Sequence, residues 1–261
     1  MTETLSPLET AKFAAAKRAC EFVESGMKLG LGTGSTADWF VKSLGELVAG
    51  GLRVTAVPTS TRTGDLARSL GINVVSLEEA KWLDLTVDGT DEFDPEFLLI
   101  KGGGGALLHE KVVATASERM IVIADTTKEV AALGAFPLPV EVIPFGWSTT
   151  ASLIQEALPS LNVVGTDVRR RGGHDAPFRT DEGNFILDLF LGRIGDPRQL
   201  ALVLNQIPGV VENGLFVDIC DTVVIGHGNG TAEVSDLTGT KTPPTPQTNT
   251  DQDNIFSDIA D

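Results

Sequence analysis

The segment DGTDEFDPEFLLIKGGGGALLHE, residues 88–110, constrains what this 261-residue chain can fold into more than any other. Apolar runs at 83–87 and 97–100 stand before its two charged sets, so we expect both sets to follow strand ends, where open α/β sheets place their ligand sites. The four consecutive glycines let the backbone approach a ligand closely and turn into a helix. The charged groups of the segment are Asp88, Asp91, Glu92, Lys101 and Glu110.

The first half of the chain alternates between apolar runs and amphipathic segments. An amphipathic helix is predicted at 8–24, a strand at 27–31, and a helix that begins near Ser35 or Thr36. Further strands are predicted at 53–60, 83–87 and 120–125, with helical spacing between them. This alternation is typical of an α/β protein with a mostly parallel, doubly wound sheet and helices on both faces.

The turn GLGTGST between the first strand and its helix has the features of a phosphate cradle. The free N–H groups and the positive dipole end of a helix favour an anion. The hydroxyls of Thr33, Ser35 and Thr36, with Gly34 between them, add further donors. The motif matches neither common nucleotide-binding glycine pattern, so an ordinary tight turn is the alternative.

The character of the sequence changes near residue 133. Prolines interleave with apolar residues in FPLPVEVIP, which suits an edge strand or a crossover between domains. A compact α+β unit follows, in which the charge run 169–171 is interpreted as a solvated face. We therefore predict a smaller domain, 133–208, inserted into a larger one that comprises 1–132 and 209–235, followed by a disordered acidic tail at 236–261.

The composition narrows the possible partners. The formal net charge of −16 argues against nucleic acid and anionic membranes, although a local cationic pocket can still hold a phosphate because exposed charges are screened over about 8 Å. No apolar run reaches 18 residues and the N-terminus lacks a signal-peptide pattern, so we expect a cytoplasmic protein. The separated Cys20 and Cys220 suggest buried thiols.

These residues suit proton transfer next to a carbonyl in a phosphorylated sugar. Glu110 is the candidate base, Lys101 would stabilise the enediolate, and Asp88 and Asp91 would exchange hydroxyl protons. This chemistry needs no metal or organic cofactor. Three alternatives stand beside it: the aspartates form an Asx turn or chelate magnesium, the glycine run is a hinge, and Lys128 is only an exposed turn residue.

At these residues the chain resembles the ribose-5-phosphate isomerases of the A type. The matching blocks cover about residues 8–230: GLGTGSTADWF, DGTDEFD, IKGGGGALLHEK, IADTTK, GAFPLPVEVIP, GNFILDL and IPGVVENGLF. The resemblance implies interconversion of ribose 5-phosphate and ribulose 5-phosphate in the non-oxidative pentose phosphate pathway. It also implies a Rossmann-like domain with a small α+β insertion, no cofactor, and a homodimer or homotetramer.

By position, the resemblance assigns Glu110 as the proton acceptor. The implied substrate-binding residues are Thr33, Gly34, Ser35, Thr36, Asp88, Gly89, Thr90, Asp91, Lys101, Gly102, Gly103, Gly104 and Lys128. The chain departs from the family pattern at Thr90 and Gly105, where alanine is expected, and at His109, where arginine is common. We expect the first two to be tolerated, whereas His109 removes a fixed charge beside the base.

Two other classes of function compete with an isomerase. A sugar-phosphate sensor domain would bind such a ligand without turnover, although no helix-turn-helix precedes Leu8. A coenzyme A transferase or an amino-sugar phosphate deaminase would use the same scaffold for different chemistry. Trapping of a covalent thioester identifies the transferase, and ammonia release identifies the deaminase.

Overall fold

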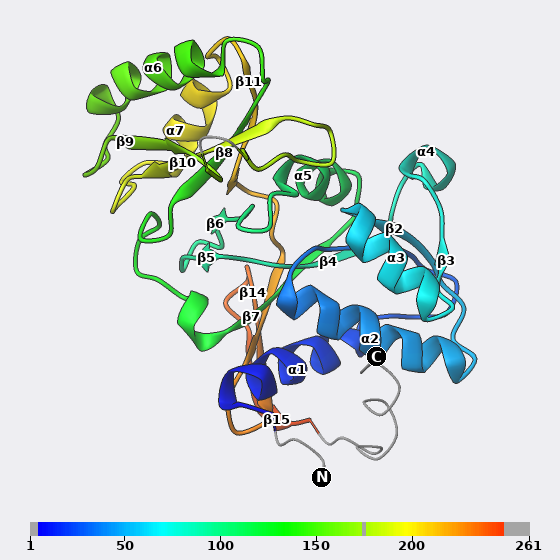
Figure 1. Cartoon of the computed structure of the whole chain (residues 1–261). Coiled ribbons are helices and arrows are strands. Elements are labelled where there is room, and N and C mark those ends of the chain that lie inside the picture. Colours follow the sequence, from blue (N-terminus) through cyan, green and yellow to red (C-terminus); the bar gives the residue numbers. More distant parts are fainter. Residues whose placement is uncertain (1–4, 174–175, 248–261) are drawn as a thin grey trace.

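The computed structural model describes residues 5–173 and 176–247, and its largest feature is an eight-stranded sheet (Figure 1). Its strands are β1 (Lys28–Leu31), β2 (Thr55–Pro58), β3 (Asn73–Val74), β4 (Leu85–Gly89), β7 (Met120–Asp125), β13 (Thr222–Gly226), β14 (Thr231–Asp236) and β15 (Lys241–Pro246). They lie in the order β15-β14-β13-β7-β4-β1-β2-β3. Pairing is parallel from β13 to β3 and antiparallel at β14 and β15.

Helices cover both faces of this sheet. One face carries α1 (Pro7–Cys20), α2 (Ser35–Ala49) and α3 (Thr61–Ser69), and the other carries α4 (Leu77–Ala80) and α5 (Leu107–Thr115). Successive side chains of a strand point to opposite faces. Ile121 and Ile123 of β7 therefore pack into the core beneath α1 and α2, while Met120 and Val122 pack on the other side. This confirms the predicted α/β class with a mostly parallel, Rossmann-like sheet.

The chain order reverses beside β1. From β1 the chain proceeds outward through β2 and β3, then returns to the other side of β1 with β4 and continues to β7. Ligands in open α/β sheets bind beyond the carboxyl ends of the strands at such a switch point. The turn after β1 and the end of β4 are therefore the positions where a site is expected.

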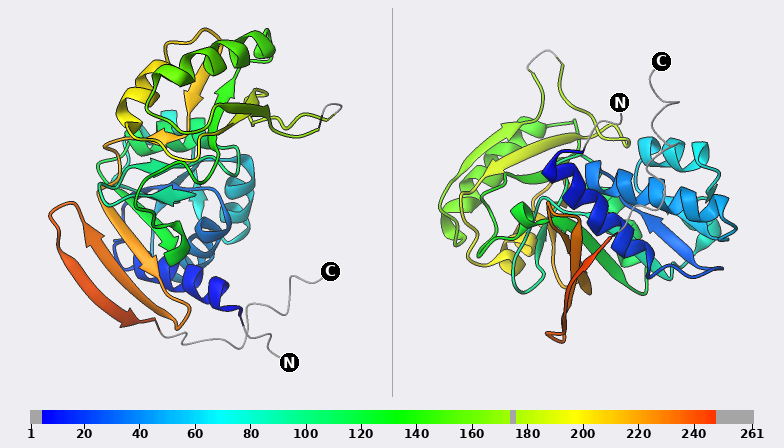
Figure 2. Two further views of the ribbon diagram at one scale, coloured as in Figure 1. Left: turned by 90° about the vertical axis from the view of Figure 1, so that its left-hand side faces the viewer. Right: turned by 90° about the horizontal axis from the view of Figure 1, so that it is seen from below.

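A second, four-stranded antiparallel sheet forms the smaller part of the molecule (Figure 2). Its strands are β8 (Leu138–Val142), β9 (Asp167–Arg170), β10 (Phe185–Phe190) and β11 (Val210–Asn213), in the order β11-β8-β10-β9. Helices α6 (Trp147–Ala157) and α7 (Pro197–Leu204) pack on it, and a short 3₁₀ turn, η2 (Leu158–Ser160), follows α6. Its core includes Val140, Leu187 and Ile154, all fully buried.

Two expectations about this part were wrong. The proline-containing strand β8 lies between β11 and β10 and not at an edge, because the carbonyl of Pro139 accepts a hydrogen bond from the Gly214 N–H and its missing donor is tolerated. Strand β11 also pairs with β8, so the chain does not rejoin the large sheet at residue 209. The division into separate domains with the boundaries given above stays a prediction.

A small three-stranded sheet links the two larger ones. It contains β5 (Glu92–Phe93), β6 (Leu99–Ile100) and β12 (Leu215–Phe216), all paired antiparallel. The predicted strand at 97–100 is therefore real at its end, but it does not belong to the parallel sheet as we expected. Lys101 follows β6 and reaches the site from the side.

The expected disorder from residue 236 onward was wrong as far as the structure describes the tail. Strand β15 pairs with β14 at the edge of the large sheet, where β14 would otherwise leave its backbone groups unpaired (Figure 2). Composition was a poor guide because this strand contributes backbone hydrogen bonds and not buried side chains. The rest of the predicted tail, 248–261, lies outside the described residues.

Candidate active site

The turn after β1 meets the end of β4 at close range. Gly32 lies against the Asp88 side chain, and a Cβ at position 32 would come within 2.0 Å of Asp88 Oδ1. The Thr33 N–H donates to the same oxygen at 3.2 Å, and the Gly89 N–H donates to it at 2.7 Å. Gly34, with φ 127°, then precedes the first turn of α2. A glycine is therefore required at 32 for the two strand ends to share one carboxylate.

Three buried charged side chains lie together beyond these strands. Lys101 Nζ lies 2.9 Å from Asp88 Oδ2 and 3.5 Å from Glu110 Oε2, and it also donates to the Gly89 carbonyl. The exposed fractions of the three residues are 2% for Lys101, 0% for Asp88 and 3% for Glu110. Glu110 lies on the first turn of α5, and Lys101 follows β6. Buried charges are rare unless paired, so this cluster indicates a functional site.

The surroundings alter the proton affinity of each group. Burial, followed by repulsion from Asp88, raises the pKa of Glu110 to about 8 against the attraction of Lys101. Burial also raises the pKa of Asp88, opposed by the neighbouring ammonium. Burial disfavours the charge on Lys101, but the attraction of Asp88 and Glu110 outweighs it and raises the pKa of the lysine. Glu110 is thus poised to exchange a proton near neutral pH while Lys101 keeps its charge.

The glycine loop, residues 102–105, is held in a tight turn beside this cluster. Its Gly105 N–H donates to the Gly102 carbonyl at 2.9 Å, and its Gly103 N–H donates to Asp91 Oδ2 at 2.7 Å. Both Gly102 and Gly105 have positive φ, 105° and 78°, which favour glycine. These bonds argue against the hinge alternative and give Asp91 a partner beyond its own turn.

One cavity of about 190 Å³ brings nearly all the predicted residues together. The predicted residues that line it are Thr33, Gly34, Ser35, Thr36, Gly89, Thr90, Asp91, Lys101, Gly102, Gly103, Gly104, Glu110 and Lys128. Asp88 is the exception, because it lies beneath the cavity wall and contacts Lys101. The roles assigned to these residues from the sequence stay predictions.

Four further residues line the cavity and were missed: Leu8, Lys12, Asp125 and Thr127. Asp125 ends β7 and is only 2% exposed, with Oδ1 accepting from the Thr127 N–H and Oδ2 without a hydrogen-bond partner among the described residues. Its position at a strand end was a usable signal. Leu8 and Lys12 lie on α1, and only the packing of α1 beside the sheet brings them here.

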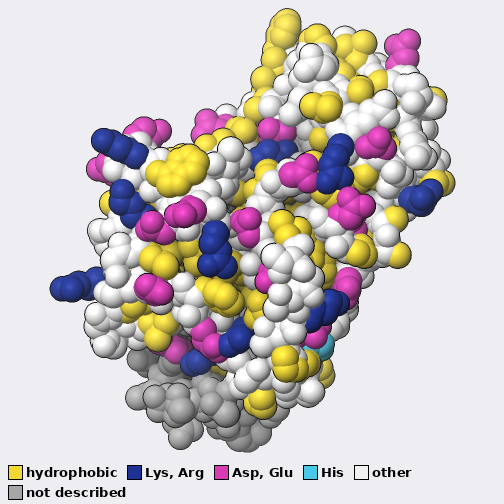
Figure 3. All heavy atoms as spheres, turned by 180° about the vertical axis from the view of Figure 1, so that it is seen from behind, with side chains coloured by type: hydrophobic (Ala, Val, Ile, Leu, Met, Phe, Trp, Pro, Cys, Tyr) yellow, Lys and Arg dark blue, Asp and Glu magenta, His cyan; other side chains and the backbone are white. Residues whose placement is uncertain are grey.

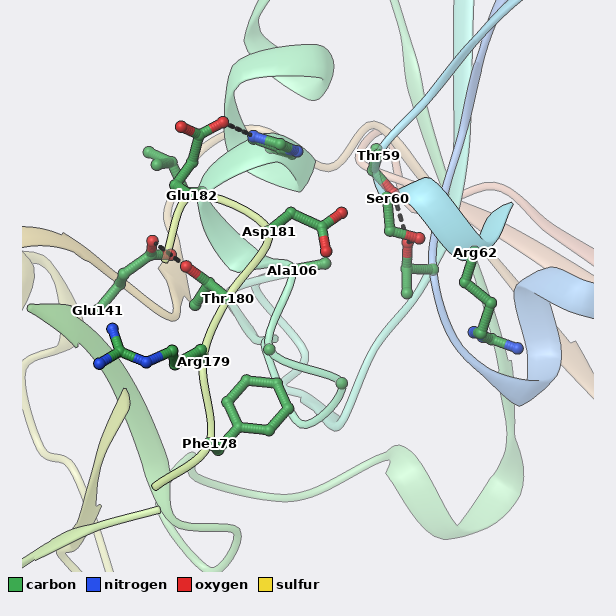
Figure 4. A pocket seen from close by; sticks show the side chains of 15 residues that line it. Thr59, Ser60, Arg62, Ala106, Glu141, Phe178, Arg179, Thr180, Asp181 and Glu182 are labelled. Atoms are coloured by element: carbon green, nitrogen blue, oxygen red, sulfur yellow. Dashed lines mark hydrogen bonds and ion pairs between the residues drawn. The ribbon is translucent and has the colours of Figure 1, made fainter. Parts of the chain in front are cut away.

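A second pocket, of about 160 Å³, lies on the other side of the glycine loop (Figure 4). His109 lines this pocket and pairs with Glu182 at 2.8 Å, so it does not face the cavity that holds Glu110. Asp181 and Glu182 enter from the connection between β9 and β10, whereas Ser60 and Arg62 belong to the start of α3. The departure at His109 therefore changes this second pocket.

The remaining charges are arranged in ordinary ways. On the face shown in Figure 3, Lys and Arg side chains are interspersed with Asp and Glu. Within residues 5–173 and 176–247, no group of three or more His, Cys, Asp or Glu side chains is placed to hold a metal ion. In the same part of the chain, no helix has the length and apolar character needed to cross a bilayer.

Comparison with known proteins gives concordant matches. The family model described as Ribose 5-phosphate isomerase A (phosphoriboisomerase A) matches residues 55–230. A ribose-5-phosphate isomerase A of Ruegeria pomeroyi is 62% identical over the full length of both chains, and one of Cereibacter sphaeroides is 65% identical over 98% of each. A D-ribose-5-phosphate isomerase solved with phospho-erythronic acid is similar with a TM-score of 0.80 and 40% identity, over 88% of this chain and 99% of that one. The ribose 5-phosphate isomerase of Plasmodium falciparum has a TM-score of 0.82 at 33% identity, over 87% and 98% of the two chains.

Proposed function

This chain belongs to the ribose 5-phosphate isomerase A family, and we propose that it performs the aldose–ketose isomerisation of that family with Glu110 as the base. The substrate pair is ribose 5-phosphate and ribulose 5-phosphate, interconverted in the non-oxidative pentose phosphate pathway. The observation that carries the proposed mechanism is the placement of Glu110 and Lys101 on one cavity, with 3.5 Å between Oε2 and Nζ.

The turn before α2 supports a phosphate at that end of the cavity. The first N–H groups of a helix and its dipole favour an anion, and the Ser35 and Thr36 hydroxyls stand beside them. The hydroxyl of Thr33 has a different role, because it bonds to Thr59 at 2.8 Å and to Ser60 at 2.8 Å. We therefore assign the phosphate to the backbone of 33–36 and to the Ser35 and Thr36 hydroxyls, with Thr33 anchoring the turn.

The proton then moves between the two carbons at the other end of the substrate. Glu110 takes the hydrogen from C2 of the aldose, and the electron pair forms the enediolate double bond between C1 and C2. The C1 oxygen becomes negative beside the Lys101 ammonium and gains a proton, while the C2 hydroxyl loses one. Return of the proton from Glu110 to C1 completes the ketose, so no redox partner is consumed. An acid–base group typically contributes about 10² to 10⁴ in rate, and a preorganised oxyanion partner about 3 to 4 kcal/mol.

The two aspartates are given separate tasks by their burial. Asp91 lines the cavity and can exchange the hydroxyl protons of the substrate. Asp88 is fully buried and bonds to Lys101 and the turn after β1, so we assign it to holding the ammonium in place. Lys128, in the 3₁₀ turn η1 (Thr126–Lys128), supplies a second cation at the cavity rim.

The direct test is turnover of ribose 5-phosphate by the purified protein in the presence of EDTA. We expect ribulose 5-phosphate to accumulate to equilibrium. Ligand binding without any product would instead indicate a sensor domain and would contradict the proposed reaction. Ammonia release from glucosamine 6-phosphate would indicate a deaminase.

The assembly and location of the protein are also proposed from the family. We expect a homodimer or homotetramer, which would cover exposed apolar side chains such as Trp82 and Phe145, 58% and 88% exposed in the single chain. We also propose a cytoplasmic enzyme, in keeping with the free, buried thiols of Cys20 and Cys220. Light scattering on the purified protein checks the assembly, and a single-chain mass would contradict it.

A further inference from the structure

The connection between β9 and β10 reaches from the small sheet to the glycine loop. Its Phe178 ring lies where a Cβ at Gly105 would meet it at 2.4 Å. Its Asp181 accepts from the N–H and hydroxyl of Thr61, at 2.8 and 3.0 Å, at the start of α3. Figure 4 shows Phe178 and Asp181 on this segment, facing the loop and α3. The connection therefore bridges the two parts of the molecule directly behind the active-site loop.

Arg171, at the start of this connection, makes the most direct contact with the loop. Its guanidinium donates to both carboxylate oxygens of Asp188 on β10, at 3.0 and 2.5 Å. Its Nη1 also donates to the carbonyls of Gly102 at 2.9 Å and Gly103 at 3.0 Å. The expectation that the run 169–171 is merely a solvated face was thus wrong for Arg171, which is fixed by a bidentate pair in the small sheet.

The planar peptide bond carries this contact to the other side of the loop. In a trans peptide unit the C=O and the following N–H point in opposite directions. The Gly102 carbonyl points at Arg171, so the Gly103 N–H points away from it and donates to Asp91 at 2.7 Å. The Gly103 carbonyl also points at Arg171, which turns the Gly104 N–H away from the guanidinium. That N–H has no hydrogen-bond partner within the described part of the chain, and Gly104 lines the cavity.

We propose that Arg171 is a positioning residue for the isomerase, which orients two peptide units of the glycine loop from behind. One unit holds Asp91, and the other presents the Gly104 N–H to an oxygen at the reactive end of the sugar phosphate. Arg171 itself contacts no reacting atom. This inference rests on the proposed function, because the loop orientation matters for catalysis only if the substrate occupies this cavity.

The experiment compares Arg171→Met with Arg169→Met. Arg169 belongs to the neighbouring strand β9, pairs with Asp167 and packs against Phe190, away from the loop. We expect Arg171→Met to lower kcat/KM about tenfold, the effect of losing about 1.4 kcal/mol of transition-state stabilisation. Affinity for phospho-erythronic acid should fall in parallel, because its carboxylate resembles the enediolate oxygens. Arg169→Met should change neither quantity by more than about twofold.

Two further measurements separate positioning from simple loss of stability. Amide hydrogen exchange of residues 102–105 should accelerate in Arg171→Met and not in Arg169→Met, whether or not the enzyme is turning over. Arg171→Lys, which keeps the charge but not the bidentate fork, should recover part of the activity, and it replaces the methionine variant if that variant fails to fold. Wild-type kcat/KM and unchanged exchange in Arg171→Met would overturn the proposal. Accelerated exchange in a protein with no isomerase activity would leave the strap intact and contradict the proposed function instead.

Discussion

The two pockets on either side of the glycine loop contain similar charged groups in opposite settings. In the cavity, Lys101 and Glu110 are 2% and 3% exposed, and the pKa of Glu110 is raised to about 8. In the second pocket, the His109 and Glu182 side chains are 36% and 56% exposed and form a surface ion pair. Exposed pairs contribute little because water screens them, whereas buried groups interact strongly. The comparison indicates that burial, and not the mere presence of acids and bases, marks the side where chemistry occurs.

The largest expected effect separates the two glutamates. Glu110→Gln keeps the shape of the side chain but removes the base, so kcat should fall about 10³-fold, within the range typical of general bases. Glu182→Gln, on the other side of the loop, should stay within about twofold of wild type. Steady-state kinetics with ribose 5-phosphate measure both. Similar losses in the two variants would break the comparison.

Removal of the buried ammonium should have the next largest effect. Lys101→Met is expected to lower kcat about 10²-fold, because one preorganised oxyanion partner is lost. The substitution also leaves Asp88 buried without its cation, so the thermal midpoint should fall as well. Kinetics and calorimetry on the same preparation check the two effects. An active variant with nearly wild-type kcat would show that Lys101 is only structural.

The pH dependence of activity sharpens the same contrast. Since Glu110 must be ionised to accept a proton and its pKa is about 8, kcat/KM should rise with pH and level off above about pH 8. The profile of Glu182→Gln should coincide with that of the wild type. A rate that is already constant from pH 6 upward would place the base at an ordinary carboxylate pKa and contradict the burial argument.

The smallest expected effect concerns stability. The folded state holds a proton on Glu110 up to about pH 8, whereas the unfolded chain releases it near 4.5. Between these values the folded state binds more protons, so the free energy of unfolding falls as pH rises. Glu110→Gln lacks this loss, and its thermal midpoint should exceed that of the wild type by about 2 to 4 °C at pH 8.5, with a smaller gain at pH 5. A difference that does not change with pH would contradict the raised pKa.

Much of the site was predictable because it depends on local sequence. Glycines with positive φ, acids at the end of a buried strand and a carboxylate early in a helix are all visible in 88–110. The contacts of Lys12, Asp125 and Arg171 were not, since they depend on how distant elements pack. Lys12 reaches the cavity only because α1 lies beside the sheet, and Arg171 because β9 approaches the loop.

The fold shows the same limit. Alternating periodicity predicted the parallel sheet, but β6 and β11 were assigned to the wrong sheet because short apolar strands carry no signal for their partners. Strand β15 was missed because its side chains are polar or proline and its stabilisation comes from backbone pairing with β14. Sequence patterns thus located the elements better than their neighbours.

The central claim is that Glu110 carries the proton between two sugar carbons. The most direct test follows ribose 5-phosphate in D₂O by proton NMR, with wild type and Glu110→Gln, and records both ketose formation and loss of the carbon-bound hydrogen signals. The account predicts rapid conversion by the wild type and neither conversion nor exchange above about a thousandth of that rate in the variant. Conversion or exchange by Glu110→Gln at the wild-type rate would contradict it.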